Sequence, residues 1–147
     1  MERMTIPRMD NVLIVVDDLD AVIAFFVELG MELEGRTMVD GHSVDRLVAL
    51  DGVRSEIAMM KTPDGHCRIE LDKFHAPAAV RVEPQDAPVN ALGIRRIMFD
   101  DIEDVLARLQ AHGAELVGEV TQFENNYRLC YVRGPEGIMV ALAEQIG

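Results

Sequence analysis

The sequence predicts an α+β fold in which two tandem βαβββ modules form a curved mixed sheet around a concave cavity. An internal repeat is the main observation, because residues 16–35 and 99–118 align at an offset of 83 with eight identities in twenty positions. The identical pairs are Asp17/Asp100, Asp18/Asp101, Val22/Val105, Ala24/Ala107, Gly30/Gly113, Glu32/Glu115, Leu33/Leu116 and Gly35/Gly118. A second repeat pairs Thr62-Pro-Asp-Gly65 with Gly134-Pro-Glu-Gly137, each before a strand-like run. The 147 residues therefore predict a single domain built from one module used twice.

The first module is expected over residues 9–75. Residues 11–16 are apolar and rich in β-branched side chains, which predicts a buried strand. A helix is expected next, because apolar residues recur at helical spacing and Gly30 follows as a typical helix end. Those apolar positions are Leu19, Val22, Ile23, Phe26 and Leu29. Further strands are predicted over residues 31–37, 46–50, 56–60 and 68–71.

The second module is expected over residues 93–145, after a proline-containing linker over 76–92. Its helix has an apolar stripe and ends at Gly113. The stripe consists of Ile102, Val105, Leu106 and Leu109. Strands are predicted over residues 115–122, 127–133 and 138–143, with a turn at 134–137.

The charge of the chain restricts its partners. With 14 basic and 26 acidic residues the formal net charge is −12, which argues against binding to nucleic acid or to anionic membranes. It favours cationic or neutral small ligands, and the alternative is that it serves only solubility. No apolar run reaches the ~20 residues of a membrane helix, and the first residues lack a signal-peptide core, so a cytoplasmic location is expected. Cys67 and Cys130 are too few for a disulfide framework and are expected to be buried, inert thiols.

This duplicated pattern resembles the vicinal oxygen chelate superfamily, which includes glyoxalase I, extradiol dioxygenases, methylmalonyl-CoA epimerases and bleomycin-resistance proteins. The resemblance covers residue 9 to about residue 145. It rests on Val15-Val16-Asp17-Asp18-Leu19, Ala21-x-x-Ala24-Phe25-Phe26-x-x-Leu29-Gly30 and Pro63-Asp64-Gly65 followed by Ile69-Glu70-Leu71, with their counterparts in the second half. It implies a small-molecule cavity and a homodimer.

The resemblance also implies four metal-ligand positions, typically His or Gln on the first strand of each module and Glu on the last. Here they correspond to Asn11, Glu70, either Ile94 or Arg96, and Ala141. Only Glu70 is a strong ligand, and an iron dioxygenase would need two imidazoles and a carboxylate. Extradiol chemistry is therefore disfavoured, and glyoxalase or epimerase chemistry by the usual ligand set is weakened.

A substitute metal site is a further hypothesis. His66 and Glu70 are four residues apart on a strand-like run, and His42 lies in a polar segment expected to be a loop. Together they could bind nickel, zinc, manganese or iron. The alternative is that His66 simply follows a turn and His42 is a solvated loop residue.

Other candidate residues are expected to contact a ligand. Arg96 could pair with a ligand carboxylate, and the alternative is a surface arginine. Tyr127 and Tyr131 share a strand face and could present phenols to a ligand, or pack in the core.

Two functions follow from these residues. The first is a metal-assisted lyase, isomerase or epimerase of a small oxygenated substrate, with Glu70 as the catalytic residue. The second is a metal-free protein of the bleomycin-resistance type that sequesters an antibiotic or toxin.

Overall fold

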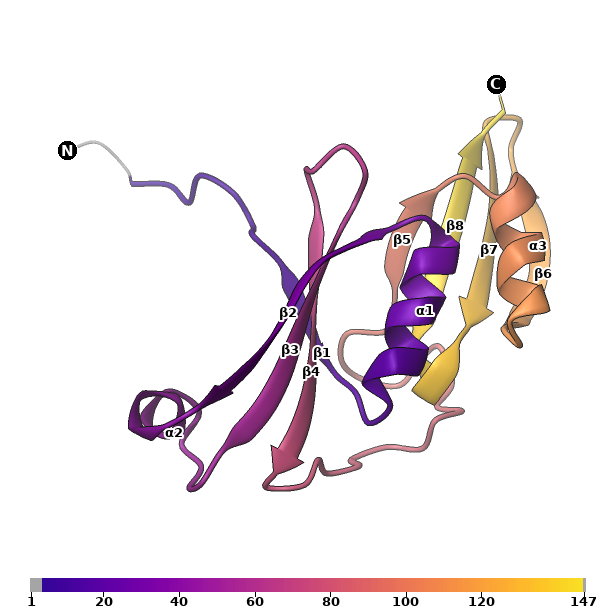
Figure 1. Cartoon of the computed structure of the whole chain (residues 1–147). Helices are drawn as coiled ribbons and strands as arrows, with labels where there is room; N and C mark the ends of the chain where they lie inside the picture. The colour runs from indigo at the N-terminus through magenta and orange to yellow at the C-terminus, as the bar shows by residue number, and fades with distance from the viewer. Residues whose placement is uncertain (1–3, 147) are drawn as a thin grey trace. The chain divides into compact units, whose positions relative to one another are not determined.

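The computed structural model describes residues 4–146 and contains two four-stranded mixed sheets (Figure 1). The first sheet contains β1 (Val12–Val15), β2 (Glu32–Asp40), β3 (Arg54–Lys61) and β4 (Arg68–Ala76), in the order β1-β4-β3-β2. The second contains β5 (Ile97–Asp100), β6 (Glu115–Phe123), β7 (Tyr127–Arg133) and β8 (Met139–Gln145), in the order β5-β8-β7-β6. In each sheet the first strand is parallel to the last, and the other pairs are antiparallel. The identical topology confirms the fold class and the duplication.

The chain divides into two compact units, and the first helix belongs to the second of them. Among the described residues, 4–19 and 31–79 form the first unit, whereas 20–30 and 80–146 form the second. The helix α1 (Leu19–Leu29), which the sequence places between β1 and β2, is thus grouped with the second sheet. The sequence modules predicted at 9–75 and 93–145 do not show this, because helical periodicity does not specify which sheet a helix packs against.

In the second unit, α1 and α3 (Glu103–Ala111) lie side by side over one face of the sheet (Figure 1). Arg108 Nε donates a hydrogen bond to the carbonyl oxygen of Glu28 at 3.0 Å, and His112 lies 3.3 Å from the Glu28 carboxylate. Almost fully buried side chains of β7 and β8 form that face of the sheet, and they are Cys130, Val132, Val140 and Leu142. Burial raises the pKa of the Cys130 thiol, as expected for an inert cysteine.

The prediction of a strand over residues 46–50 is wrong, because the helix α2 (His42–Val48) covers most of this segment. The Asp45 carboxylate accepts hydrogen bonds from the backbone N–H groups of Gly52 and Val53, at 3.0 and 2.9 Å, and these bonds fold the chain back after the helix. They also lower the pKa of Asp45. Leu47 is 83% exposed, so the short apolar run that suggested a strand does not face a core.

The other predicted elements are found within a few residues of their expected limits. The largest difference is β4, which continues to Ala76. Cys67 is exposed in the turn before β4, which corrects the expectation of a buried thiol. Among residues 4–146, no helix is long and apolar enough to cross a membrane.

The predicted linker is attached to the second sheet through Arg133. Its guanidinium donates hydrogen bonds to the carbonyl oxygens of Gln85 and Ala87, at 2.9 and 2.8 Å. Ala87 is buried, and Arg95 forms an ion pair with Glu83 at 3.0 Å. These contacts hold the irregular segment before β5 in place.

Gly134 tests the packing of α1 on the second sheet. A Cβ atom at this position would lie 2.7 Å from two ring atoms of Phe25 on α1, so Gly134→Ala should lower the free energy of unfolding by about 1–3 kcal/mol. Gly35→Ala is the matched control, because a Cβ there meets no atom within 4 Å and the backbone is not left-handed. Urea unfolding of both variants measures the effect. If Gly134→Ala and Gly35→Ala had the same free energy of unfolding, the close packing of Phe25 on α1 against Gly134 would be contradicted.

Candidate functional site

The register of the parallel strands decides which residues are equivalent in the two sheets. Leu13 of β1 pairs with Glu70 of β4, and Met98 of β5 pairs with Ala141 of β8. Glu70 and Ala141 are therefore counterparts, as the family resemblance implies. Counting two residues back from Leu13 and Met98 reaches Asn11 and Arg96, so Arg96 is the counterpart of Asn11. Ile94, the other candidate for this position, is 80% exposed.

The four residues at the implied metal-ligand positions do not fit a divalent metal. The Asn11 amide donates a hydrogen bond to the Asp10 carboxylate at 2.9 Å. Glu70 supplies a carboxylate, but the guanidinium of Arg96 has no lone pair to offer. Ala141 presents only a buried methyl group. Hard and borderline cations require several oxygen, nitrogen or sulfur donors, and this set supplies one strong donor.

The structure does not bring together the substitute set of His42, His66 and Glu70. His42 begins α2, directly after the end of β2 where Asp40 pairs with Arg54. His66 lies in the turn at the other end of β3, where Lys61 pairs with Arg68. The eight residues of β3 separate the two ends by roughly 23 Å. In the described chain, no group of three or more His, Cys, Asp and Glu residues is arranged to hold a metal ion.

His66 belongs to a turn with its own hydrogen bonds, and not to the strand on which it was expected. Its backbone N–H donates to Asp64 Oδ1 at 3.0 Å, and the Thr62 hydroxyl donates to the same oxygen at 2.6 Å. These bonds lower the pKa of Asp64, with the Thr62 bond contributing most. The interpretation of His66 as a residue following a turn agrees with this geometry.

A pair of carboxyl groups lies on the face of the first sheet that carries Glu70. Glu70 and Asp72 are two residues apart on β4 and therefore point to the same side. Asp72 is only 7% exposed, and its pKa is raised to about 7, mainly by burial and further by the hydrogen bond with Glu70 and the charge of Glu70. Sequence reasoning missed Asp72, although the alternation Glu70-Leu71-Asp72 on a predicted strand was the available signal.

The surroundings of this carboxyl pair are largely apolar. Leu13 and Val15 pair with Glu70 and Asp72 from β1, and Met59 and Ile57 pair with them from β3. Ser55, on the same side of β3, is buried, and neither its Oγ nor Asp72 Oδ1 has a hydrogen-bond partner within residues 4–146. A carboxyl group that titrates near neutral pH in such surroundings can donate or accept a proton.

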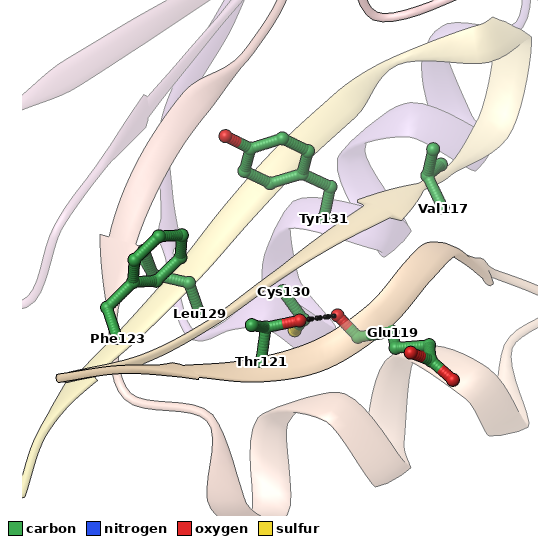
Figure 2. Close-up of a pocket in the computed structure, with 7 residues that line it drawn as sticks. All are labelled: Val117, Glu119, Thr121, Phe123, Leu129, Cys130 and Tyr131. Atoms are coloured by element: carbon green, nitrogen blue, oxygen red, sulfur yellow. Dashed lines mark hydrogen bonds between the residues drawn. The ribbon is translucent and has the colours of Figure 1, made fainter. Parts of the chain in front are cut away.

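The second sheet carries a pocket of about 290 Å³ where β6 and β7 separate. Between the pairs Val117/Tyr131 and Thr121/Leu129, β6 advances four residues while β7 advances two, so β6 bulges outward. Gly118 begins the bulge with a φ of 81°, a conformation that glycine adopts without strain. The pocket is lined by Val117, Glu119, Thr121, Phe123, Leu129, Cys130 and Tyr131 (Figure 2).

Two of the ligand-binding residues predicted from the sequence meet at this pocket. The guanidinium carbon of Arg96 lies 4.4 Å from the centroid of the Tyr131 ring, a cation–π contact. Tyr127 is 47% exposed, pairs with Phe123 at the far end of β7 and is not part of the lining. Asn11 belongs to the first unit, where its amide contacts Asp10.

Asp72 makes the stability of the protein depend on pH. Its carboxyl titrates near 3.8 in the unfolded chain and near 7 in the folded protein, so the folded state binds more protons between these pH values. The contribution of Asp72 to the free energy of unfolding therefore falls as the pH rises from about 4 to 7. Asp72→Asn should be more stable than the native chain at pH 8, by on the order of 2 kcal/mol, and the difference should vanish below pH 4.

Urea unfolding of both proteins at pH 4, 6 and 8 measures this difference. Asp51→Asn, which removes an exposed carboxylate before β3, should show no such pH-dependent gain. A constant difference between Asp72→Asn and the native chain at all three pH values would contradict the raised pKa.

Comparison with known proteins identifies the family. The sequence profile of the Glyoxalase/Bleomycin resistance protein/Dioxygenase superfamily matches residues 8–142. The crystal structure of a glyoxalase family protein from Bacillus cereus is 54% identical, with a TM-score of 0.93 over 100% of this chain and 99% of that chain. YwbC, an uncharacterized protein of Bacillus subtilis, is 29% identical over 133 residues, which are 88% of this chain and 91% of that protein.

A more distant structure shares the fold alone. TnmS3, an antibiotic binding protein from Streptomyces, is 19% identical, with a TM-score of 0.59 over 97% of this chain and 99% of that chain. The profile match, which spans nearly the whole sequence, and the duplicated sheet topology agree. The chain belongs to the glyoxalase/bleomycin resistance protein/dioxygenase superfamily.

Proposed function

We propose that this protein binds a small organic molecule without a metal and acts by sequestering it. The observation that carries the proposal is the side-chain chemistry at the four positions that the resemblance implies, where Arg96 and Ala141 offer no metal donor and Asn11 offers a weak one. A scaffold that keeps its ligand-binding surfaces but not its metal donors suits binding better than Lewis-acid catalysis. The likeness in fold to an antibiotic binding protein of Streptomyces is in keeping with this function.

The pocket on the second sheet supports the proposal. Phe123, Leu129 and Tyr131 supply apolar and aromatic surface, while the Thr121 hydroxyl and Glu119 supply polar groups. Pockets for small ligands commonly combine a mainly apolar lining with a few polar groups that fix the ligand's orientation. A volume of about 290 Å³ suits a compact ring system.

Binding without a metal can be measured by ¹⁵N chemical-shift titration of the intact chain in EDTA. We expect the neutral aromatic probe 2-naphthamide to shift the amides of residues 117–131. Phe123→Ala should weaken binding about fivefold, because half of this ring is available for contact. Met38→Ala, at a 44% exposed apolar residue on β2, is the matched control and should leave the affinity unchanged.

The same titration with nickel, zinc, manganese or iron in place of EDTA should leave the affinity unchanged. Elemental analysis of protein purified without a chelator should find metal far below one equivalent. Probe binding only in the presence of a metal, or a stoichiometric metal content, would refute sequestration without a metal.

Acid–base catalysis on a carbonyl compound is a second candidate function. The observation that favours it is the pair of Glu70 and Asp72, in which the pKa of Asp72 is raised to about 7, close to the value that suits a general base. Such a pair could remove a proton from a carbon next to a carbonyl group. Asp72 would then be the base, and Glu70 would help to raise the pKa of Asp72 through its hydrogen bond and its charge.

Hydrogen–deuterium exchange at the carbon of a simple ketone tests this second function. The protein should speed exchange of dihydroxyacetone, and the rate should rise with pH through 7, because the base must be deprotonated. Asp72→Asn should lower the rate at least tenfold, a typical share for a general base. Glu32→Gln, an exposed carboxylate at the start of β2, is the control. Exchange at the same rate in Asp72→Asn would rule out this role.

A further inference from the structure

We propose that Arg96, stacked on Tyr131, is an anion-binding group of the pocket on the second sheet. The ligand class that follows is an aromatic or other flat apolar molecule that carries a carboxylate or a similar oxyanion. This inference rests on the proposed binding function and adds the charge of the ligand to it.

Arg96 differs in its partners from Arg95 and Arg128, which lie in the same unit. Arg95 forms an ion pair with Glu83 at 3.0 Å, and Arg128 forms ion pairs with Glu144 and Glu103. Arg96 is exposed, and within residues 4–146 it has no hydrogen bond or ion pair, only its contact with the Tyr131 ring. The donors of its guanidinium are therefore not used by any carboxylate of the described residues.

The contact with Tyr131 orients Arg96 without using its hydrogen-bond donors. A guanidinium at 4.4 Å from the ring centroid is held by the face of the ring, so its N–H groups stay available. The planar set of five donors matches the two oxygens of a carboxylate. A restrained guanidinium also loses less side-chain entropy when a ligand binds.

The remaining lining residues fit the apolar part of such a ligand. Tyr131 belongs both to the contact with Arg96 and to the pocket, so the cation adjoins the cavity. Leu129 and Phe123 line the same cavity, and Figure 2 shows them on the side of β7 toward which Tyr131 points. An apolar body could thus lie on these side chains while its charged end reaches Arg96.

Glu119 is the one acidic side chain of the lining, and it specifies the orientation of the ligand. Figure 2 shows its carboxylate pointing away from the Tyr131 ring, and its carbonyl oxygen accepts the hydrogen bond of the Thr121 hydroxyl at 3.2 Å. A ligand carboxylate would be repelled near Glu119 and attracted near Arg96. The anionic end is therefore assigned to the Arg96 side of the pocket.

Arg96 places a positive charge at one of the four family positions. Arg96 is the counterpart of Asn11, at a position where the family resemblance implies a metal ligand. A fixed guanidinium there places positive charge on the protein itself. The family scaffold could hold an oxygen anion in this way without a metal.

Three probes with the same ring system test the charge preference by ¹⁵N titration in EDTA. We expect 2-naphthoate to bind about tenfold more tightly than neutral 2-naphthamide, the usual effect of a charge-assisted hydrogen bond. The cation 2-naphthylmethylammonium should bind more weakly than the amide. Equal affinities, or a preference for the ammonium probe, would overturn the proposal.

Substitutions at Arg96 and Tyr131 assign the preference to these residues. Arg96→Gln should reduce 2-naphthoate affinity to that of the amide and leave amide binding unchanged. Arg46→Gln, on α2 of the first unit, removes the same net charge and should have no effect. Tyr131→Phe should keep the preference because it keeps the ring, whereas Tyr131→Leu should abolish it.

The amide probe separates the two proposals. If Arg96→Gln still prefers the carboxylate, Arg96 is not the anion-binding group, although binding without a metal stands. If neither 2-naphthamide nor 2-naphthoate binds in EDTA, both proposals fail. Binding of the amide alone refutes only the anion-binding role.

Discussion

In both sheets, the parallel pairing between the first and the last strand of the module decides which residues occupy the four family positions. This pairing sets Leu13 beside Glu70 in one sheet and Met98 beside Ala141 in the other. A shift of one residue in this register would turn Glu70 and Asp72 together to the side of the sheet opposite Leu13 and Val15. The equivalence of Asn11 and Arg96, and with it the argument about metal ligands, depends on the same register.

The two sheets share a topology and differ in the chemistry of their equivalent faces. In the first sheet, the buried Asp72 and the half-buried Glu70 lie among apolar side chains, and burial holds a proton on Asp72 up to about pH 7. In the second sheet, Ala141 occupies the position equivalent to Glu70, so this position carries no carboxylate. The neighbouring charge is instead that of Arg96, which rests on the Tyr131 ring. The two sheets therefore differ in their side chains at equivalent positions, although their strand order is the same.

Much of the fold could be predicted from the sequence, because the signals involved are local. The apolar stripe of α1 and the glycine that follows it read directly as a helix and its end. The secondary structure of residues 46–50 could not be predicted in this way. A run of five mixed apolar and polar residues is compatible with a strand and with a helical turn. Its outcome depends on hydrogen bonds that the backbone N–H groups of Gly52 and Val53 donate to the Asp45 carboxylate, and these residues lie outside that window. For the site, the loss of metal donors at Ala141 was visible in the sequence, but the choice between Ile94 and Arg96 required the strand register.

The sequence by itself determined the duplicated module, the position of Glu70 on its last strand and the residue types that stand where the family holds a metal. These properties follow from the order and periodicity of neighbouring residues. The tertiary structure alone decided that α1 packs on the second sheet, that Asp72 is buried beside Glu70, that β6 bulges to open a pocket, and that Arg96 stacks on Tyr131. Each of these depends on which distant segments pair and in which register, and that choice is made by the packing of the whole unit.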